Sequence, residues 1–334
     1  MYNLSTIQSA VSADSQLLDA IEDGFAAFSA GSVHVAPVVH LGFKDAAGAA
    51  LGDTCVKTGF VKAAENFVVK IASGRAGNAA LGLSTSSGVM LVFSQRTGKL
   101  EAMLHDEGWL TDLRTAAAGA VVARLFAPLD ADKLGIVGTG VQARLQLELL
   151  LTVLTECREV VLCGRSQAKL DLMASDCAAL LPAITKLRTT TLSSELVGCA
   201  VVVTATSATT PVLHSSDVAP GTLVIAVGAD GLGKQELDPA ILGAAELVVV
   251  DSIAQCAAFG DASHAIASGV VGAEALVELG AAINETRAAG SDAPPPPRLA
   301  RAGGSRSVVA DLTGVAVQDV VIATIALAKI RGAC

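Results

Sequence analysis

Aromatic side chains are scarce in this chain of 334 residues, which has one tryptophan, one tyrosine and eight phenylalanines. The tyrosine is Tyr2, beside the N-terminus, and this position argues against a dehydrogenase mechanism that needs a central catalytic tyrosine. Hydrophobic residues still make up 52% of the chain, which excludes a disordered scaffold. The core must therefore be built mainly from Ala, Val and Leu, whose small side chains let helices and sheets approach closely.

Basic charge is also scarce, because 23 Lys and Arg stand against 32 Asp and Glu, a net charge of −9 at pH 7. Nucleic acid and anionic membranes prefer a basic surface, so we expect neither as a partner. No uninterrupted apolar run reaches the roughly 18–20 residues of a membrane span, and residues 1–14 lack a secretory signal pattern. The seven cysteines are scattered without a Cys-x-x-Cys pair, which favours a cytoplasmic protein. The five histidines show no metal-ligand spacing, so we assign no metal.

The order of strand-like and helix-like segments predicts an α/β protein with two domains. Residues 14–30 have helical spacing with Asp14 as N-cap, and residues 34–105 contain short strands separated by Gly-containing turns. A long helix over 110–126 is followed by alternating strands and helices, the pattern of a parallel sheet covered on both faces. A strand over 307–311 and a helix over 315–330 follow a Pro-rich loop, and we expect both to return to the first block. The predicted domains are residues 1–127 with 305–334, and residues 128–304.

The clearest local motif is Gly138-Thr139-Gly140-Val141-Gln142-Ala143, directly after a predicted strand that ends at Val137. In a dinucleotide-binding turn, the first Gly permits the tight bend, the second lets the backbone approach a pyrophosphate, and Ala lets the helix and strand pack closely. The following helix N-terminus offers free N–H groups to phosphate. The alternative is a plain turn between a strand and a helix, since the pattern alone is weak in a Gly-rich chain.

The end of the second strand of this domain bears on the choice of cofactor. An NAD enzyme usually presents a carboxylate there to the ribose 2′-OH, but this chain reads Gly164-Arg165-Ser166. Arg165 and Ser166 could bind a 2′-phosphate, which favours NADP(H) and leaves NAD(H) possible. The alternative is that Arg165 only stacks on adenine and that either cofactor binds.

Two charged residues stand in otherwise apolar segments of the first block. Lys70 lies in a predicted strand of β-branched residues, and Arg114 interrupts a helix of small residues that must pack tightly. A guanidinium in such a place needs an anionic partner. The anion is either a ligand or, in the simpler interpretation, Asp112 or Glu107.

Several segments, in order along nearly the whole chain, resemble the ornithine cyclodeaminase/μ-crystallin family. They are Asn78–Leu83, Leu110-Thr111-x-x-Arg114-Thr115-Ala116-Ala117, Gly138-x-Gly140-x-Gln142-Ala143, Thr204-Ala205-Thr206, Val227–Asp238 and Thr313–Asp319. The resemblance implies a homodimer in which each chain has a Rossmann domain and a discontinuous α+β domain for substrate binding and dimerisation. Known members include cyclodeaminases, ketimine and imino-acid reductases, an alanine dehydrogenase and a thyroid-hormone-binding crystallin.

The resemblance also implies roles for individual residues. Lys70 corresponds to the substrate lysine, Arg114 to the arginine that binds the substrate carboxylate, and Asp230 to the acidic residue that faces the nicotinamide. Thr313-Gly314 resembles the segment that closes over the nicotinamide. The further cofactor-binding candidates are Thr85, Thr204, Ala205, Thr206, Val227 and Gly228, together with Arg114.

One position departs from the family pattern. The family commonly has Pro-x-Arg in its first strand, where the Arg holds the substrate carboxylate, but this chain has Val39 at that place. Lys57, on a neighbouring predicted strand, is the candidate replacement, and a solvated lysine on a sheet edge is the alternative. The Lys57-Thr58-Gly59 segment is similar to a branch of the family that is closer to imine reductases.

These features predict an enzyme that reduces an α-imino acid with NAD(P)H by hydride transfer to C2. Arg114, with Lys57 or Lys70, would hold the carboxylate, and Lys70 or Asp230 would deliver the proton to nitrogen. The expected ligand is a small imino, amino or keto acid. Two alternatives stay open: a cyclodeaminase that recycles bound NAD and releases ammonia, and a crystallin-like protein that binds NADPH and a hydrophobic anion without turnover.

Overall fold

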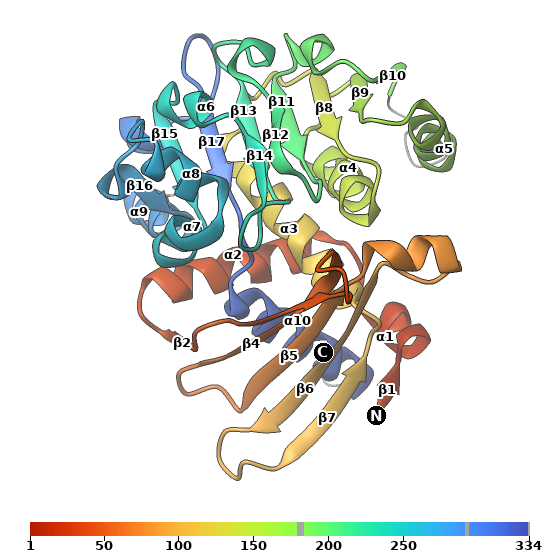
Figure 1. Ribbon diagram of the computed structural model, residues 1–334. Helices are drawn as coiled ribbons and strands as arrows, with labels where there is room; N and C mark the ends of the chain where they lie inside the picture. Colours follow the sequence, from red (N-terminus) through yellow and green to blue (C-terminus); the bar gives the residue numbers. More distant parts are fainter. Residues whose placement is uncertain (179–183, 291–293, 333–334) are drawn as a thin grey trace. The chain divides into compact units, whose positions relative to one another are not determined.

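The computed structural model describes residues 1–178, 184–290 and 294–332. The chain divides into two compact units, Met1–Arg114 with Val315–Cys334, and Thr115–Gly314 (Figure 1). Helix α3 (Trp109–Phe126) runs across the first boundary. Residues 115–127 and 305–314, predicted to lie in the first domain, thus belong to the second unit. The predicted roles of the units in substrate binding and dimerisation stay predictions.

The first unit is a mostly antiparallel sheet with helices packed on one face. The sheet follows the order β1-β7-β6-β5-β4-β2, with β3 also paired to β4. Its strands are β1 (Tyr2–Asn3), β2 (Val33–Val35), β3 (Val39–Lys44), β4 (Ala50–Val61), β5 (Asn66–Gly74), β6 (Ser86–Ser94) and β7 (Leu100–His105). Its other elements are α1 (Leu4–Ala10), α2 (Ser15–Ser29), η1 (Ala76–Leu81) and α10 (Ala316–Ile330).

The two faces of this sheet differ. Along β5, residues 66, 68 and 70 are buried, and the residues between them are only half-buried, as the alternation of side chains in a strand requires. Helix α10 packs against β4, β5 and β6 and also against α2. The predicted N-cap of α2 is confirmed, since the carboxylate of Asp14 accepts a hydrogen bond from the Leu17 N–H at 3.0 Å.

The second unit is built on a parallel sheet with the order β10-β9-β8-β11-β13-β17-β15-β16. Its strands are β8 (Lys133–Val137), β9 (Glu159–Cys163), β10 (Lys186–Thr190), β11 (Val201–Thr204), β13 (Leu223–Ala226), β15 (Leu247–Val250), β16 (Leu276–Glu278) and β17 (Val308–Asp311). The chain leaves β8 for β9 and β10 on one side and then crosses to β11 on the other. In a sheet of this topology the usual ligand site lies at such a reversal, beyond the carboxyl ends of the strands, here β8 and β11.

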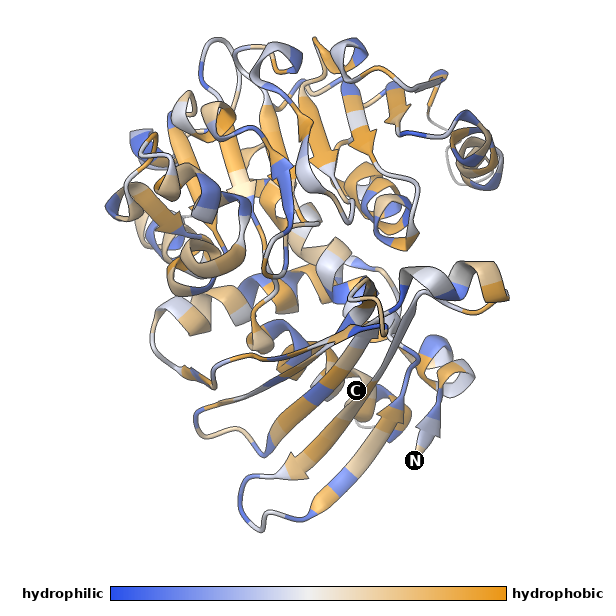
Figure 2. Cartoon of the chain, viewed as in Figure 1, coloured by the Kyte–Doolittle hydropathy of each residue, from blue (hydrophilic) through white to orange (hydrophobic). Residues whose placement is uncertain are grey.

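Most residues of β8, β9, β11, β13, β15 and β17 are buried and apolar (Figure 2). The edge strand β10 is partly polar and mostly half-buried. The connecting helices are α4 (Val141–Val153), α5 (Gln167–Ala178), α6 (Pro239–Gly243), α7 (Ile253–Phe259), α8 (Asp261–Ala267) and α9 (Leu279–Ala289). The remaining elements are β12 (Thr209–Leu213), β14 (Gln235–Leu237), η2 (Ser193–Leu196), η3 (Ser215–Asp217), η4 (Ala273–Ala275) and η5 (Pro297–Leu299). Strand β12 pairs with β14 in a small parallel sheet.

The α/β class with a Rossmann domain is confirmed, but three local expectations change. The apolar residues of 33–43 predict a single strand, but the structure divides this segment into β2 and β3 around Pro37, which has no N–H for a sheet ladder. The strand expected to return to the first block is β17, which lies between β13 and β15 in the parallel sheet. The sequence also predicts a helix over 167–180, and the last residues of that segment lie outside the described residues.

Among the described residues, none of the helices combines the length and the apolar character that crossing a membrane requires.

Candidate functional site

Two lysines lie side by side on the covered face of the first unit's sheet. Lys57 of β4 is directly opposite Lys70 of β5 in the antiparallel register. Their exposed fractions are 4% and 1%, respectively. Like charges directly opposite each other destabilise a sheet, and buried charges are costly unless they are paired. Two buried lysines in this arrangement destabilise the fold unless an anion lies nearby.

Helix α10 provides an anion within the same unit. Asp319 Oδ2 lies 3.1 Å from Lys70 Nζ, and Asp319 Oδ1 lies 3.0 Å from Arg114 Nε. The neighbouring Gln318 is also turned inward, because its Oε1 accepts a hydrogen bond from Arg114 at 3.1 Å and its Nε2 donates to the Arg114 carbonyl at 3.3 Å. The first turn of α10 thus binds both the guanidinium group and the backbone carbonyl of Arg114.

Positive charge exceeds negative charge in this cluster. Burial, followed by the charges of Lys70 and Arg114, lowers the pKa of Lys57 to about 8, against the opposing effect of Asp319. Burial alone would raise the pKa of Asp319, but the three cations outweigh it and hold that pKa below its ordinary value. Burial raises the pKa of Asp106, whose Oδ2 accepts the Leu110 N–H at 2.8 Å. The cluster keeps a positive excess even with Asp106 ionised, because three cations stand against two carboxylates.

The structure brings together Lys57, Lys70 and Arg114 and decides between the alternatives left open for them. The anion beside Arg114 is Asp319, which lies more than two hundred positions away in the chain, and not Asp112 or Glu107 as in the simpler interpretation. Lys57 is buried within the sheet, so the interpretation as a solvated edge lysine is wrong.

Lys57 does not replace the arginine that the family commonly has at the position of Val39. Val39 pairs with Val56 across β3 and β4, so its side chain points to the face opposite that of Lys57. Lys57 therefore joins the cationic cluster from its own position and does not fill the place of Val39.

Sequence reasoning missed Gln318 and Asp319 as site residues. The available signal was a pair of polar residues inside an otherwise apolar helix, within the motif that carried the family resemblance. Both are 1% exposed, and buried polar side chains of this kind need partners.

In the second unit, the predicted nucleotide turn has the geometry of a phosphate cradle. Gly138 has a φ of +127°, and a Cβ there would lie 2.5 Å from the Ala205 carbonyl oxygen, so only glycine fits. A Cβ at Gly140 would meet nothing within 4 Å, and Gly140 caps α4 without a side-chain hydrogen bond. The helix N-terminus is thus open to an anion, and the residues present fit a dinucleotide pyrophosphate.

The other predicted nucleotide residues of this unit gather at the carboxyl ends of the strands. Gly164 follows β9 and lies against this turn, since a Cβ on it would lie 3.3 Å from a methyl carbon of Thr139. Arg165 is exposed and Ser166 is half-buried. Val141 is exposed and Gln142 is half-buried in the first turn of α4.

The predicted segments after β11, β13 and β17 are held by buried carboxylates. Thr204, Thr206 and Gly228 donate hydrogen bonds to Glu236, while Ala205 and Val227 are buried beside them. Thr313 Oγ1 and the Gly314 N–H donate to Asp251 at 3.1 and 2.6 Å. Sequence reasoning did not identify either carboxylate.

Two predicted residues lie apart from these groups. Asp230 is exposed in the loop after β13, and its Oδ1 lies 2.5 Å from Lys234 Nζ. Thr85 is exposed just before β6 in the first unit, where its carbonyl accepts a hydrogen bond from the Arg75 N–H.

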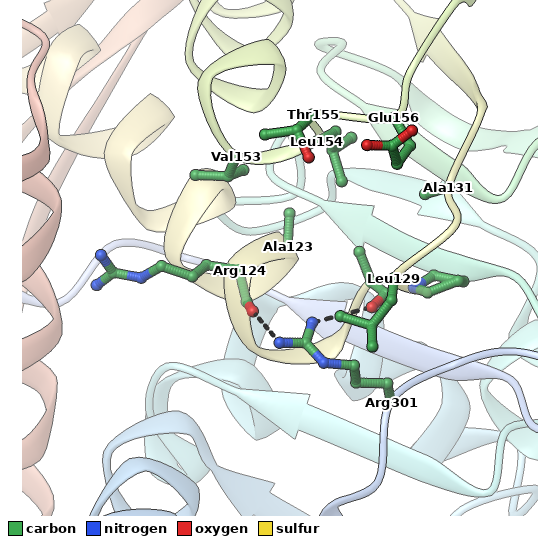
Figure 3. Close-up of a pocket in the computed structure, with 11 residues that line it drawn as sticks. Ala123, Arg124, Leu129, Ala131, Val153, Leu154, Thr155, Glu156 and Arg301 are labelled. Carbon is green, nitrogen blue, oxygen red and sulfur yellow. Dashed lines mark hydrogen bonds between the residues drawn. The ribbon is translucent and has the colours of Figure 1, made fainter. Parts of the chain in front are cut away.

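A cavity of about 240 Å³ lies in the second unit at the C-terminal end of α3 (Figure 3). Arg301 reaches into it and donates to the carbonyls of Arg124 and Ala127 at 2.7 and 3.0 Å. These contacts satisfy carbonyls at the end of α3. None of the predicted site residues lines this cavity, and we assign it a structural role.

A Rossmann sheet with an open glycine turn and a separate sheet with a buried cationic cluster define a two-domain dinucleotide-binding protein. Residues 1–333 match the model of the ornithine cyclodeaminase/mu-crystallin family, and the chain belongs to this family. The resemblance stated from the sequence is thereby confirmed.

Relatives match along most of their length. A protein of Rhizobium meliloti whose name assigns it to the dehydrogenases is 36% identical over 321 residues, 96% of this chain and 92% of the relative. The structure of an archaeal alanine dehydrogenase dimer with bound NAD has a TM-score of 0.84 at 29% identity, with 99% of this chain and 95% of the other covered. The iminosuccinate reductase of Paracoccus denitrificans with NAD+ has a TM-score of 0.83 at 28% identity, with 99% and 97% covered.

Proposed function

We propose that this protein reduces an α-imino acid with a nicotinamide dinucleotide. The observation that carries the proposal is the buried cluster of Lys57, Lys70 and Arg114, whose positive charge exceeds that of its carboxylates. Relatives are named dehydrogenases and reductases, in agreement with the predicted class of NAD(P)-dependent oxidoreductases. When bound, the dinucleotide would supply a hydride to C2 of the imine.

The protein's own residues would bind and orient the substrate. Arg114 is held at its side chain and at its carbonyl by α10, so its guanidinium is preorganised to receive a carboxylate. Lys57 would share that carboxylate from the neighbouring strand. A fixed carboxylate sets the direction in which the imine carbon faces.

The proton for the imine nitrogen would come from Lys70 or Asp230. Lys70 Nζ lies 3.1 Å from Asp319 Oδ2 and bears N–H protons that it could donate. Asp230 is an exposed carboxylate paired with Lys234. Variants Lys70→Met and Asp230→Asn would distinguish them, because loss of the proton donor lowers kcat by about 10²–10⁴-fold.

We further propose NADP(H) as the preferred cofactor. Gly164 presents no carboxylate after β9, and the exposed Arg165 and the neighbouring Ser166 could bind a 2′-phosphate. Two solved relatives contain NAD, so NAD(H) is the competing choice that a direct comparison of the two must exclude.

We also propose that the protein is a homodimer formed through the uncovered face of the first unit's sheet. Val39, Leu41 and Phe43 alternate along β3 and are 53%, 50% and 40% exposed. Phe67 and Phe93, stacked with ring centroids 4.9 Å apart, continue this apolar face across β5 and β6. Large exposed apolar faces mark interaction sites, and one solved relative is a dimer.

The test is a screen at 340 nm of NADPH and NADH against keto acids, supplied with ammonia or methylamine, and against cyclic imines. Oxidation of the cofactor that requires both the keto acid and the amine supports the reductase. Ammonia release from ornithine without net cofactor change would instead indicate a cyclodeaminase. Tight binding of NADPH and a hydrophobic anion without either signal would indicate a binding protein.

A further inference from the structure

Glu236 is a buried acid that joins three parts of the second unit. It lies in β14 and has no exposed surface. Its Oε2 accepts hydrogen bonds from Thr204 Oγ1 at 2.8 Å and from the Gly228 N–H at 2.7 Å. Its Oε1 accepts one from the Thr206 N–H at 2.5 Å. One carboxylate thus connects the end of β11, the loop after β11 and the loop after β13.

These contacts leave little freedom in the two loops. A Cβ at Gly228 would lie 2.2 Å from the Thr206 carbonyl oxygen and 2.5 Å from the Glu236 carboxyl carbon, so the loops meet at a glycine. The strand that carries Glu236 is fixed in turn, because Asp261 Oδ1 accepts the N–H groups of Glu236 and Leu237 at 2.8 and 2.9 Å. The carboxylate is therefore a rigid link.

The charge on Glu236 is costly to maintain. Burial, followed by the nearby charge of Asp261, raises the pKa of Glu236 to about 7, and the hydrogen bonds from Thr206 and Thr204 oppose that rise. An apolar side chain would avoid this desolvation cost. An acid at this position is explained if it is needed to hold its three hydrogen-bond donors in place.

We propose that Glu236 is a positioning residue that fixes the loops after β11 and β13 in the shape that receives the dinucleotide. The inference rests on the proposed function, because that function assigns the carboxyl edge of this sheet to the cofactor. Glu236 acts through Thr204, Thr206 and Gly228 and is itself behind them, with no surface for a ligand. Its loss should therefore change cofactor affinity more than the chemical step.

The test compares Glu236→Gln with the wild-type protein and with Glu195→Gln, a control at an exposed acid of the same unit. In Glu236→Gln, the side-chain NH₂ group would face one of the backbone N–H groups from which the Glu236 carboxylate now accepts a hydrogen bond, so two donors would oppose each other. Since a hydrogen bond to a charged group is worth about tenfold or more in an equilibrium constant, we expect the Kd for NADPH and NADH, measured by fluorescence, to rise at least about tenfold. We expect kcat at saturating cofactor to change less than about threefold.

Each result bears on the proposal. A Kd for Glu236→Gln equal to or tighter than that of the wild type would overturn it, and so would an equal loss in kcat and affinity. Wild-type protein that binds neither dinucleotide would instead refute the proposed function.

If Glu236→Gln does not fold, amide hydrogen exchange of the wild-type protein, with and without cofactor, tests the proposal instead. The amides of Thr206 and Gly228 should exchange slowly before any cofactor is added and change little when it binds. Amides of Thr139 and Gly140 should gain protection only with cofactor. Fast exchange at Thr206 and Gly228 in the free protein would overturn the inference.

Discussion

Replacement of Lys57 by methionine should stabilise the protein at neutral pH. The pKa of Lys57 is lowered from 10.5 to about 8 by burial and by Lys70 and Arg114. At about 1.4 kcal/mol for each pKa unit, keeping this lysine charged in the folded protein costs about 3 kcal/mol. Methionine has a similar length and no charge, so Lys57→Met should raise the free energy of unfolding by about that amount at pH 7.

The pH dependence provides a second, independent check. Because the folded pKa lies below the unfolded one, the cost is complete below about pH 8 and is relieved as the pH rises toward 10.5. The advantage of Lys57→Met should therefore shrink by about half between pH 7 and pH 9.5. Under the proposed function the same variant should lose activity, since it lacks a ligand of the substrate carboxylate.

Urea unfolding at several pH values measures these differences directly. Lys99→Met, in an exposed turn before β7, is the matched control and should change stability by less than about 0.5 kcal/mol at either pH. A variant Lys57→Met that is no more stable than the wild type at pH 7 would refute the reasoning, as would an advantage that stays constant with pH.

Three further predictions concern other residues. Asp319→Asn keeps the shape but removes the anion from the buried cations, so it should cost about 3–5 kcal/mol in urea unfolding and lower kcat/KM; full retention of both would contradict the assigned role. Arg165→Ala should lower the preference for NADPH over NADH by about tenfold or more in steady-state assays, and an unchanged ratio would remove the cofactor argument. Leu41→Lys should convert the dimer to monomers in light scattering, whereas Leu172→Lys, at an exposed leucine of α5, should not.

Local features of the fold could be predicted from the sequence. Continuous apolar segments identified the parallel strands, because strands buried on both faces have no polar side. Gly138 and Gly140 identified the phosphate turn, since one requires a positive φ and the other leaves open space. Lys70 and Arg114 stood out because charge is rare in such apolar surroundings.

Features that depend on distant parts of the chain could not be predicted. The place of β17 between β13 and β15 is set by packing of the whole sheet, and a buried strand gives no sign of its neighbours. Asp319 as partner of Lys70 and Arg114 depends on how α10 lies across the sheet. Glu236 and Asp251 were missed because half of their hydrogen-bond donors are backbone N–H groups, which every sequence contains.

The discontinuity of the first unit has a consequence for the order in which the protein is assembled. Lys57, Lys70 and Arg114 leave the ribosome before the second unit, whereas Asp319 emerges only after the whole of that unit. The long intervening segment makes closure of the first unit entropically costly until that segment has folded. We therefore expect the Rossmann unit to fold first during synthesis and the cationic cluster to gain its counter-ion only as α10 docks. A chain that stops before α10 would lack the counter-ion of these cations and would expose the sheet face that α10 covers. We expect such fragments to be prone to aggregation and proteolysis.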